Sequence, residues 1–287
     1  MSKAQRKSDT RAVLRTVDTH RSRLADLADA VRADEPDAVH QMRVSARRLR
    51  SVLGTYRSLF PRDEAQPVRD ELKWLGSVLG AARDEEVLAA RFEELLDAQA
   101  PDLVRGTVRY RLVTAHREGY REAHADAVAV LAGERYRELL TLLDILYGEA
   151  ESVGAGAVGK ELRKSRRKVL KAGASAGLGG ADPGPADALH ATRKRAKALR
   201  YAAEAVTDSR KSAKKVARGA EDLQTVLGDF QDAVVARARI LDTADRARAA
   251  GEDTFTYGVI AAAEQARQHR AVTAACTVLA VVRKRSV

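Results

Sequence analysis

Cysteine is nearly absent from this 287-residue chain, which holds a single one, Cys276. One cysteine cannot form an intrachain disulfide, and together with six scattered histidines it does not supply the ligands of a zinc cluster. Cys276 stands in the apolar stretch AVTAACTVLAVV, where we expect it to pack as a small hydrophobic side chain. We therefore expect no metal site and no cofactor.

Long apolar runs are also missing. The longest, AVTAACTVLAVV, is too short to cross a bilayer. The N-terminal residues MSKAQRKSDTR are polar and lack the apolar centre of a secretion signal. These two absences predict a cytoplasmic protein without a membrane span.

Aromatic residues make up only 4% of the chain, and there are only six prolines. Alanine, arginine, leucine and glutamate, which favour helices, are frequent, and β-branched residues do not gather in alternating runs. The pattern predicts an all-α protein. The expected helices cover residues 9–33, 37–60, 66–79, 82–98, 102–132, 135–171, 187–207, 210–227, 229–250 and 255–284.

Glycine marks the expected breaks. Gly80 and Gly228 interrupt helical patterns, and each is predicted to stop or kink its helix. The segment AGASAGLGGADPGPA, residues 172–186, lacks periodicity and is predicted to be a flexible surface loop.

Acidic residues are outnumbered by basic ones, 40 against 51, which gives a formal net charge of +11. Such a charge concerns the partners of a protein, because a basic surface attracts phosphate-rich polyanions. Nucleic acid, inorganic polyphosphate and an anionic membrane surface are the candidates.

Two pairs of segments repeat within the chain. DAVHQMRVSARRLR (37–50) aligns with DALHATRKRAKALR (187–200) at an offset of 150 residues. SVLGAARDEEV (77–87) aligns with TVLGDFQDAVV (225–235) at an offset of 148.

These matches predict a duplication inside one domain of residues 1–287. The first repeat is expected over 9–133 and the second over 134–285. Two related helical bundles packed about a pseudo-two-fold axis are the architecture that this duplication predicts.

The first motif carries a basic stripe. At about 100° per residue, five side chains fall within about a third of the helix circumference. They are His40, Arg43, Arg47, Arg50 and Arg57. Like charges at this spacing repel one another by a few tenths of a kcal/mol, so a stripe kept in both repeats indicates an anionic partner.

The second motif repeats the stripe with His190, Arg193, Lys197 and Arg200, and Lys194 lies beside them. Arg195 is expected to point towards the apolar flank and to pair with an acid there. The alternative is that these cations face solvent or pair with nearby carboxylates. The candidate carboxylates are Asp84, Asp232 and Glu204.

Each histidine follows an aspartate by three residues. Asp37 and Asp187 are predicted N-caps, which would place His40 and His190 near the third helical position. Free backbone N–H groups and the positive end of the helix dipole favour a phosphate there.

Two further basic stretches extend the candidate surface. They contribute Arg163 and Arg167 from KELRKSRRKVLK (160–171), and Lys214 and Arg218 from KSAKKVAR (211–218). Solvated helix faces explain these stretches as well as anion binding does.

The motifs resemble the CHAD family, the conserved histidine α-helical domain, over nearly the whole chain. The resemblance rests on VHQMRVSARRLRSVLGTYRSLF, LGAARDEEV, LHATRKRAKALRYAAEA and LQTVLGDFQD. It implies two four-helix bundles around a central basic cavity or groove, and binding of inorganic polyphosphate, often at polyphosphate granules. The chain is similar to a stand-alone member. When LR at 14–15 is aligned with LR at 162–163, an offset of 148, Thr19 stands where the second repeat has Arg167, which implies a less basic first helix.

The leading hypothesis is therefore non-catalytic binding of polyphosphate by the basic side chains named above. Non-specific nucleic-acid binding is an alternative, although no nucleic-acid-binding motif is present. A phosphohydrolase or phosphotransfer enzyme using His40 or His190 is a further alternative. The sequence contains no glycine-rich phosphate loop of the kind that many such enzymes use.

Overall fold

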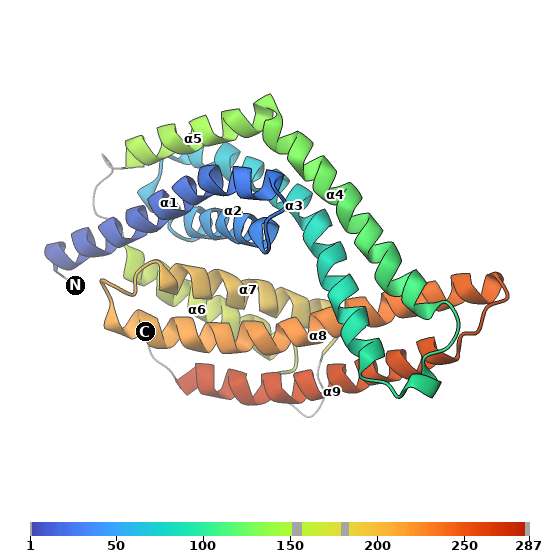
Figure 1. Ribbon diagram of the computed structural model, residues 1–287. Helices are drawn as coiled ribbons and strands as arrows, with labels where there is room; N and C mark the ends of the chain where they lie inside the picture. Colours follow the sequence, from blue (N-terminus) through green and yellow to red (C-terminus); the bar gives the residue numbers. More distant parts are fainter. Residues whose placement is uncertain (1, 151–156, 179–183, 285–287) are drawn as a thin grey trace.

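The computed structural model describes residues 2–150, 157–178 and 184–284 and shows an all-α protein, as predicted (Figure 1). The helices are α1 (Lys3–Arg32), α2 (Ala38–Thr55), α3 (Arg62–Asp97), α4 (Ala115–Ala132), α5 (Glu134–Ala150), α6 (Val158–Ser175), α7 (Ala186–Glu204), α8 (Lys211–Ala249) and α9 (Phe255–Lys284). Short 3-10 turns cover Arg57–Leu59 and Pro101–Leu103, and one π turn covers Tyr110–Thr114.

The breaks predicted at Gly80 and Gly228 are wrong, because both glycines lie inside the unbroken helices α3 and α8. A glycine inside a helix costs only about 1 kcal/mol relative to alanine. Each of these two makes room for an arginine of the neighbouring helix. A Cβ added at Gly80 would lie 3.4 Å from Nε of Arg43, and one at Gly228 would lie 3.5 Å from Nε of Arg193.

Three other boundaries differ from the prediction. The helix expected over 102–132 starts as 3-10 and π turns, and α4 begins only at Ala115. The helix expected over 135–171 is two helices, α5 and α6. The loop expected over 172–186 begins later, because α6 continues to Ser175; residues 179–183 of that loop lie outside the described part of the chain.

The helices form two layers (Figure 1). Helices α1, α2 and α5 and the first half of α3 make one bundle, and α6, α7, α8 and α9 make the other. α5 packs against α1, α3 and α4, so in space it lies with helices of the predicted first repeat. α2 contacts α7, which brings the two histidine motifs together at the centre of the molecule.

Two hydrophobic clusters hold this arrangement. The larger one runs through both bundles and includes Met42, Leu49, Leu199 and Leu223. The second lies in the arm where α3 crosses α8 and α9, at the right of Figure 1. Its members include Phe92, Leu112, Ile240 and Tyr257.

A buried ion pair joins the first helix to the connection between α7 and α8. The Asp9 carboxylate is fully buried, and Nη2 and Nε of Arg210 donate to its Oδ2 at 2.7 and 2.9 Å. The Gln5 amide donates to Asp9 at 2.8 Å and to the carbonyl of Ser209 at 2.9 Å. Close by, the Tyr56 hydroxyl donates to the Ala202 carbonyl at 2.6 Å, so the two bundles are also joined through α2 and α7.

Removing the Asp9 carboxylate is expected to destabilise the protein. Asp9→Ala takes away the buried acceptor that faces the Arg210 guanidinium, and losing one partner of a buried ion pair costs roughly 3–5 kcal/mol. Urea denaturation followed by circular dichroism measures the loss. Asp208→Ala is the control, because the exposed Asp208–Arg15 pair at 3.8 Å contributes about 0–1 kcal/mol. Equal losses in the two variants would contradict this role for Asp9.

Candidate functional site

A cluster of like charges lies where α2 meets α7. Lys197 of α7 is surrounded by Arg43 and Arg47 of α2 and by Arg193 of its own helix. Burial first, and then Arg47, Arg193 and Arg43 in that order, lower the pKa of Lys197 to about 7. Asp232 on α8 opposes this shift only in part. The cluster therefore carries more positive charge than the protein neutralises.

An open groove of about 380 Å³ continues from this cluster. Nine lysines and arginines line it, namely Arg47, Arg50, Arg57, Arg69, Lys164, Lys168, Lys194, Arg195 and Lys197. Among the described residues that line it, Glu161 is the only carboxylate, and it lies 3.7 Å from Nζ of Lys164. We call this feature the basic groove.

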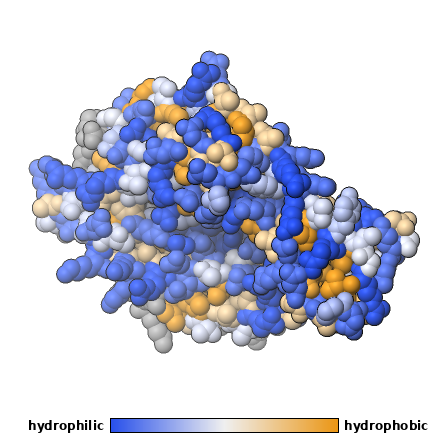
Figure 2. All heavy atoms as spheres, viewed as in Figure 1, coloured by the Kyte–Doolittle hydropathy of each residue, from blue (hydrophilic) through white to orange (hydrophobic). Residues whose placement is uncertain are grey.

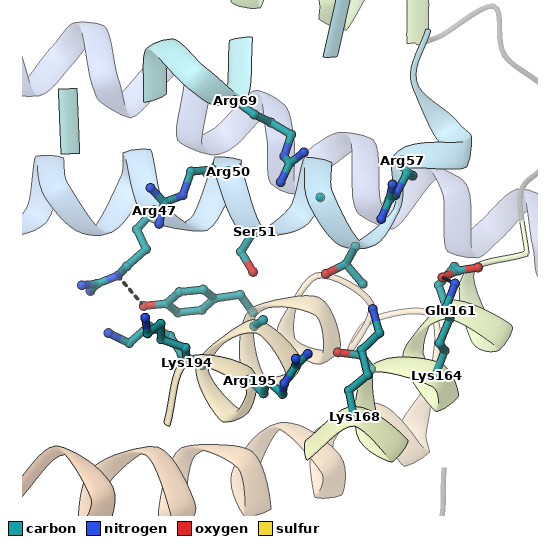
Figure 3. Close-up of a pocket in the computed structure, with 16 residues that line it drawn as sticks. Arg47, Arg50, Ser51, Arg57, Arg69, Glu161, Lys164, Lys168, Lys194 and Arg195 are labelled. Carbon is teal, nitrogen blue, oxygen red and sulfur yellow. Dashed lines mark hydrogen bonds and ion pairs between the residues drawn. The ribbon is translucent and has the colours of Figure 1, made fainter. Parts of the chain in front are cut away.

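The walls of the basic groove come from different elements (Figure 3). One wall carries Arg47 and Arg50 from α2, with Arg69 of α3 behind them. The facing wall is formed by α6, which carries Lys164 and Lys168. α7 forms the floor between them, with Lys194 and Arg195. Nε of Arg47 donates to the Tyr201 hydroxyl at 3.2 Å, and this hydrogen bond joins α2 to α7 within the groove.

Charge repulsion is built into the groove. Burial lowers the pKa of Arg50, and the neighbouring Arg69 and Arg47 lower it further. Figure 2 shows hydrophilic side chains over the recessed centre of the face seen in Figure 1. A bound polyanion would supply the missing negative charge.

Five predicted ligands line the basic groove: Arg47, Arg50, Arg57, Lys194 and Lys197. Arg43 and Arg193 lie beside it, packed against Gly80 and Gly228. Each is also near an aspartate one turn further along the glycine's helix. Nη2 of Arg43 lies 3.5 Å from the Asp84 carboxylate. Burial raises the pKa of Asp232, and the nearby Arg193 opposes that rise.

The two histidines are half-buried and lie outside the lining of the groove. Burial lowers the pKa of His40, with Arg83 as the next cause, and burial followed by Lys194 lowers that of His190. Nδ1 of His190 lies 2.9 Å from Oε1 of Gln231. Nδ1 of His40 is buried without a hydrogen-bond partner.

Asp37 stands at the predicted N-cap position of α2, whereas the N-cap predicted at Asp187 is wrong. Asp37 adopts a left-handed conformation, with φ of 64°, and its side chain does not cap α2. An N-cap residue needs extended backbone, which Asp37 lacks. α7 starts earlier than expected, at Ala186 after Pro185, so Asp187 lies within its first turn. His40 is still the third residue of α2, but His190 is the fifth of α7, beyond the free N–H groups of that helix.

The other predicted ligands lie elsewhere. Arg200 is held by two carboxylates, Glu204 at 2.7 Å and Glu221 at 2.8 Å. Four cations are exposed and do not line the basic groove, namely Arg163, Arg167, Lys214 and Arg218.

Four cations of the groove were not predicted as ligands: Arg69, Lys164, Lys168 and Arg195. The expected position of Arg195, on the apolar flank with an acid, is wrong, because it lines the groove. On α6 the groove-facing side holds Lys164 and Lys168, and Arg163 and Arg167 lie about 140° and 100° around the helix from Lys168.

Arg69 packs closely against a glycine of α2, a contact that the sequence does not indicate. A Cβ at Gly54 would lie 3.1 Å from Nη2 of Arg69, so a larger residue there would displace this guanidinium by a few tenths of an ångström. Nη1 of Arg69 also donates to the Gln66 amide oxygen at 2.6 Å.

Within residues 2–150, 157–178 and 184–284, His, Cys, Asp and Glu form no group of three that could hold a metal ion. No helix in the described part of the chain is both long and apolar enough to cross a bilayer.

Fold and groove together define a helical-bundle protein with a polycationic site. The sequence matches the CHAD domain over residues 15–241, and the chain belongs to the CHAD family, which is associated with polyphosphate-related proteins.

Relatives and solved structures agree with this assignment. The chain is 44% identical over 236 residues to the protein Rv2226 of Mycobacterium tuberculosis (strain ATCC 25618 / H37Rv). The aligned region covers 80% of this chain and 45% of that protein, so the chain spans about half the length of this curated relative. The crystal structure of the CHAD domain from the plant Ricinus communis matches with a TM-score of 0.71 at 26% identity, covering 94% of this chain and 91% of that one. PptA from Streptomyces chartreusis shares the fold, with a TM-score of 0.71 at 22% identity over 94% of this chain and 98% of that one.

Lys197 is expected to make stability depend on pH. Below about pH 7 it is protonated in both the folded and the unfolded protein, so the repulsion destabilises the fold in full. Between pH 7 and its ordinary pKa of 10.5 the folded protein has released the proton and the unfolded chain has not, so the free energy of unfolding rises with pH. Lys197→Met should remove this rise and stabilise the protein at pH 7, by a few kcal/mol at most.

Urea denaturation of both proteins at several pH values between 6 and 10 tests this. The difference between the two proteins isolates Lys197 from the other titrating groups. Parallel pH profiles for the wild type and Lys197→Met would contradict the expectation.

Proposed function

We propose that this protein binds inorganic polyphosphate without chemical turnover, and that the polymer lies in the basic groove. The observation that carries the proposal is the composition of the lining, nine cations with a single carboxylate. Such a concentration of like charge in a partly buried site is stabilised when a polyanion enters it.

The type of cation supports a phosphate ligand. Arg47, Arg50, Arg57 and Arg69 stand along one side of the groove. A guanidinium can hold two phosphate oxygens at once, and lysines add compact charges on the other side. Because neutralised phosphates release condensed counterions, binding should weaken steeply as salt is added.

The groove offers little to a nucleic-acid base. Tyr201 is its only aromatic residue, and this ring is 4% exposed with its hydroxyl bonded to Arg47. Single-strand binders need exposed aromatic faces on which bases stack. Competition at fixed salt and equal phosphate concentration compares the two ligands, and efficient displacement of polyphosphate by DNA would favour the nucleic-acid alternative.

The absence of turnover is part of the proposal. The groove itself is lined by arginines and lysines, and both histidines that could accept a phosphoryl group lie outside its lining. Incubation of polyphosphate with the protein and magnesium, followed by chain-length analysis, tests it. Shortened chains would show an enzyme instead.

Reversing two groove charges should abolish tight binding. In Arg50→Glu/Lys168→Glu the new carboxylates stand on α2 and α6 and repel the polymer from both sides. We expect affinity for long-chain polyphosphate to fall by at least roughly a hundredfold, about 3 kcal/mol. Titration of the folded protein at low salt measures it.

Arg163→Glu/Arg167→Glu is the matched control. It changes the net charge by the same amount and lies on α6, but neither residue is in the lining of the groove. We expect its affinity to fall by less than about fivefold, since only the long-range field changes. Equal losses in the two double variants would refute binding in the basic groove.

Binding should also take up protons. Lys197 lines the groove with a pKa of about 7, and a phosphate polymer beside it would raise this pKa towards its ordinary value. The complex then holds more protons than the free protein, so affinity falls as pH rises from 7 to 9. Calorimetry at pH 8 in buffers of different ionisation enthalpy counts the protons, and Lys197→Met should lose this uptake. If Lys197→Met still took up protons on binding, a group other than Lys197 would be responsible.

A further inference from the structure

A second, smaller cavity of about 140 Å³ lies on the other side of Tyr201. Its lining comes from α1, α2 and the end of α7, and consists of Thr16, Thr19, His20, Arg48, Val52, Tyr201, Glu204 and Ala205. The Arg48 guanidinium lies over the Tyr201 ring, 5.1 Å from its centroid. Tyr201 also lines the basic groove, so its side chain separates the two cavities.

The offsets of the internal repeat relate the two linings. The offset of 150 pairs Ser51 with Tyr201 and Gly54 with Glu204. The offset of 148 pairs Thr16 with Lys164 on the outer helices α1 and α6. It also pairs His20 with Lys168. The small cavity is thus the counterpart of the basic groove in the other half of the repeat.

The counterpart has lost the free positive charge of the groove. Thr16 replaces a lysine, and His20, which replaces another, is 6% exposed with a pKa lowered to about 4 by burial and then by Arg48. His20 is therefore neutral at pH 7. Its Nδ1 is buried without a hydrogen-bond partner.

Two arginines remain, Arg48 in the lining and Arg200 next to it, and Glu204 pairs with both. Glu204 lies 3.1 Å from Nη1 of Arg48 and 2.7 Å from Nε of Arg200, and Glu221 also binds Arg200, at 2.8 Å. Arg200 is the repeat counterpart of Arg50, whose pKa is lowered by the neighbouring cations Arg69 and Arg47. At the position of Glu204 the groove has Gly54, against which the Arg69 guanidinium packs, so a cation stands there in place of a carboxylate.

We propose that Glu204 is a specificity-determining residue that acts as a built-in anion. Its carboxylate takes the place that a phosphate group would occupy between Arg48 and Arg200, and so closes the second cavity to polyphosphate. The polymer is thereby confined to the basic groove. The inference rests on the proposed function, because it concerns how many sites the same ligand finds.

Glu204→Gln tests the proposal with little change of volume. It removes the carboxylate that faces Arg48 and leaves Arg200 with Glu221 alone. We expect triphosphate, used as a short probe in calorimetry, to bind at one more site per chain than in the wild type. Long-chain polyphosphate should bind roughly tenfold tighter, the order of one added charge-assisted contact, and with a steeper dependence on salt.

Glu71→Gln is the matched control for the change of net charge. Glu71 also binds an arginine, Arg135 at 2.7 Å, but it lines a different cavity, between α3 and α5. An increase in affinity equal to that of Glu71→Gln, with no added triphosphate site, would overturn the proposal. So would weaker binding by folded Glu204→Gln.

A second pair of variants does not depend on the behaviour of Glu204→Gln. Arg50→Gln should weaken polyphosphate binding roughly tenfold, whereas Arg200→Gln should change it by less than about twofold, since Arg200 is already held by Glu204 and Glu221. Equal losses would overturn the inference. If the wild-type protein binds no polyphosphate, the proposed function itself fails; if it binds and these variants do not differ, only the role of Glu204 fails.

Discussion

Repulsion between cations at the contact of α2 with α7 is the constraint that the rest of the structure satisfies. Burial, and then the neighbouring Arg47, Arg193 and Arg43, lower the pKa of Lys197 to about 7. A separate network holds the two layers together despite this repulsion, through a hydrophobic core that spans both bundles and an ion pair of the fully buried Asp9. The protein thus maintains an unfavourable arrangement of charge where an anion would make it favourable.

Two glycines contact the central arginines. Gly80 and Gly228 lie against the guanidinium groups of Arg43 and Arg193 on the neighbouring helices. A Cβ at these positions would meet the guanidinium groups at 3.4 and 3.5 Å, which is ordinary van der Waals contact, so alanine would fit at both. The contact is tighter at Gly54, where a Cβ would lie 3.1 Å from Nη2 of Arg69. Glycine here serves close approach of side chains, and the helices continue through it.

Composition and helical periodicity were enough to predict the all-α fold, and the basic stripes gave five of the nine groove cations. The remaining features depend on tertiary contacts. Glycine in a sequence predicts a break in a helix, whereas α3 continues through Gly80, which contacts Arg43 of α2. On α6 the predicted ligands were Arg163 and Arg167, whereas Lys164 and Lys168 line the groove. Basic residues occur on several sides of this helix, so its sequence does not indicate which side faces the groove. Arg200 looks like its counterpart Arg50 until the carboxylate of Glu204 is located beside it.

The length of α3 has a mechanical consequence. It carries Arg69 at the groove and Phe92 in the distal hydrophobic cluster on one uninterrupted helix, about 35 Å apart along its axis. α8 likewise passes from the central bundle into that cluster without a break. α3, which carries Arg69 of one wall of the basic groove, and α8, which packs against the floor helix α7, are therefore both anchored at a remote point, and this anchorage limits how far that wall and the floor can move apart when a ligand enters.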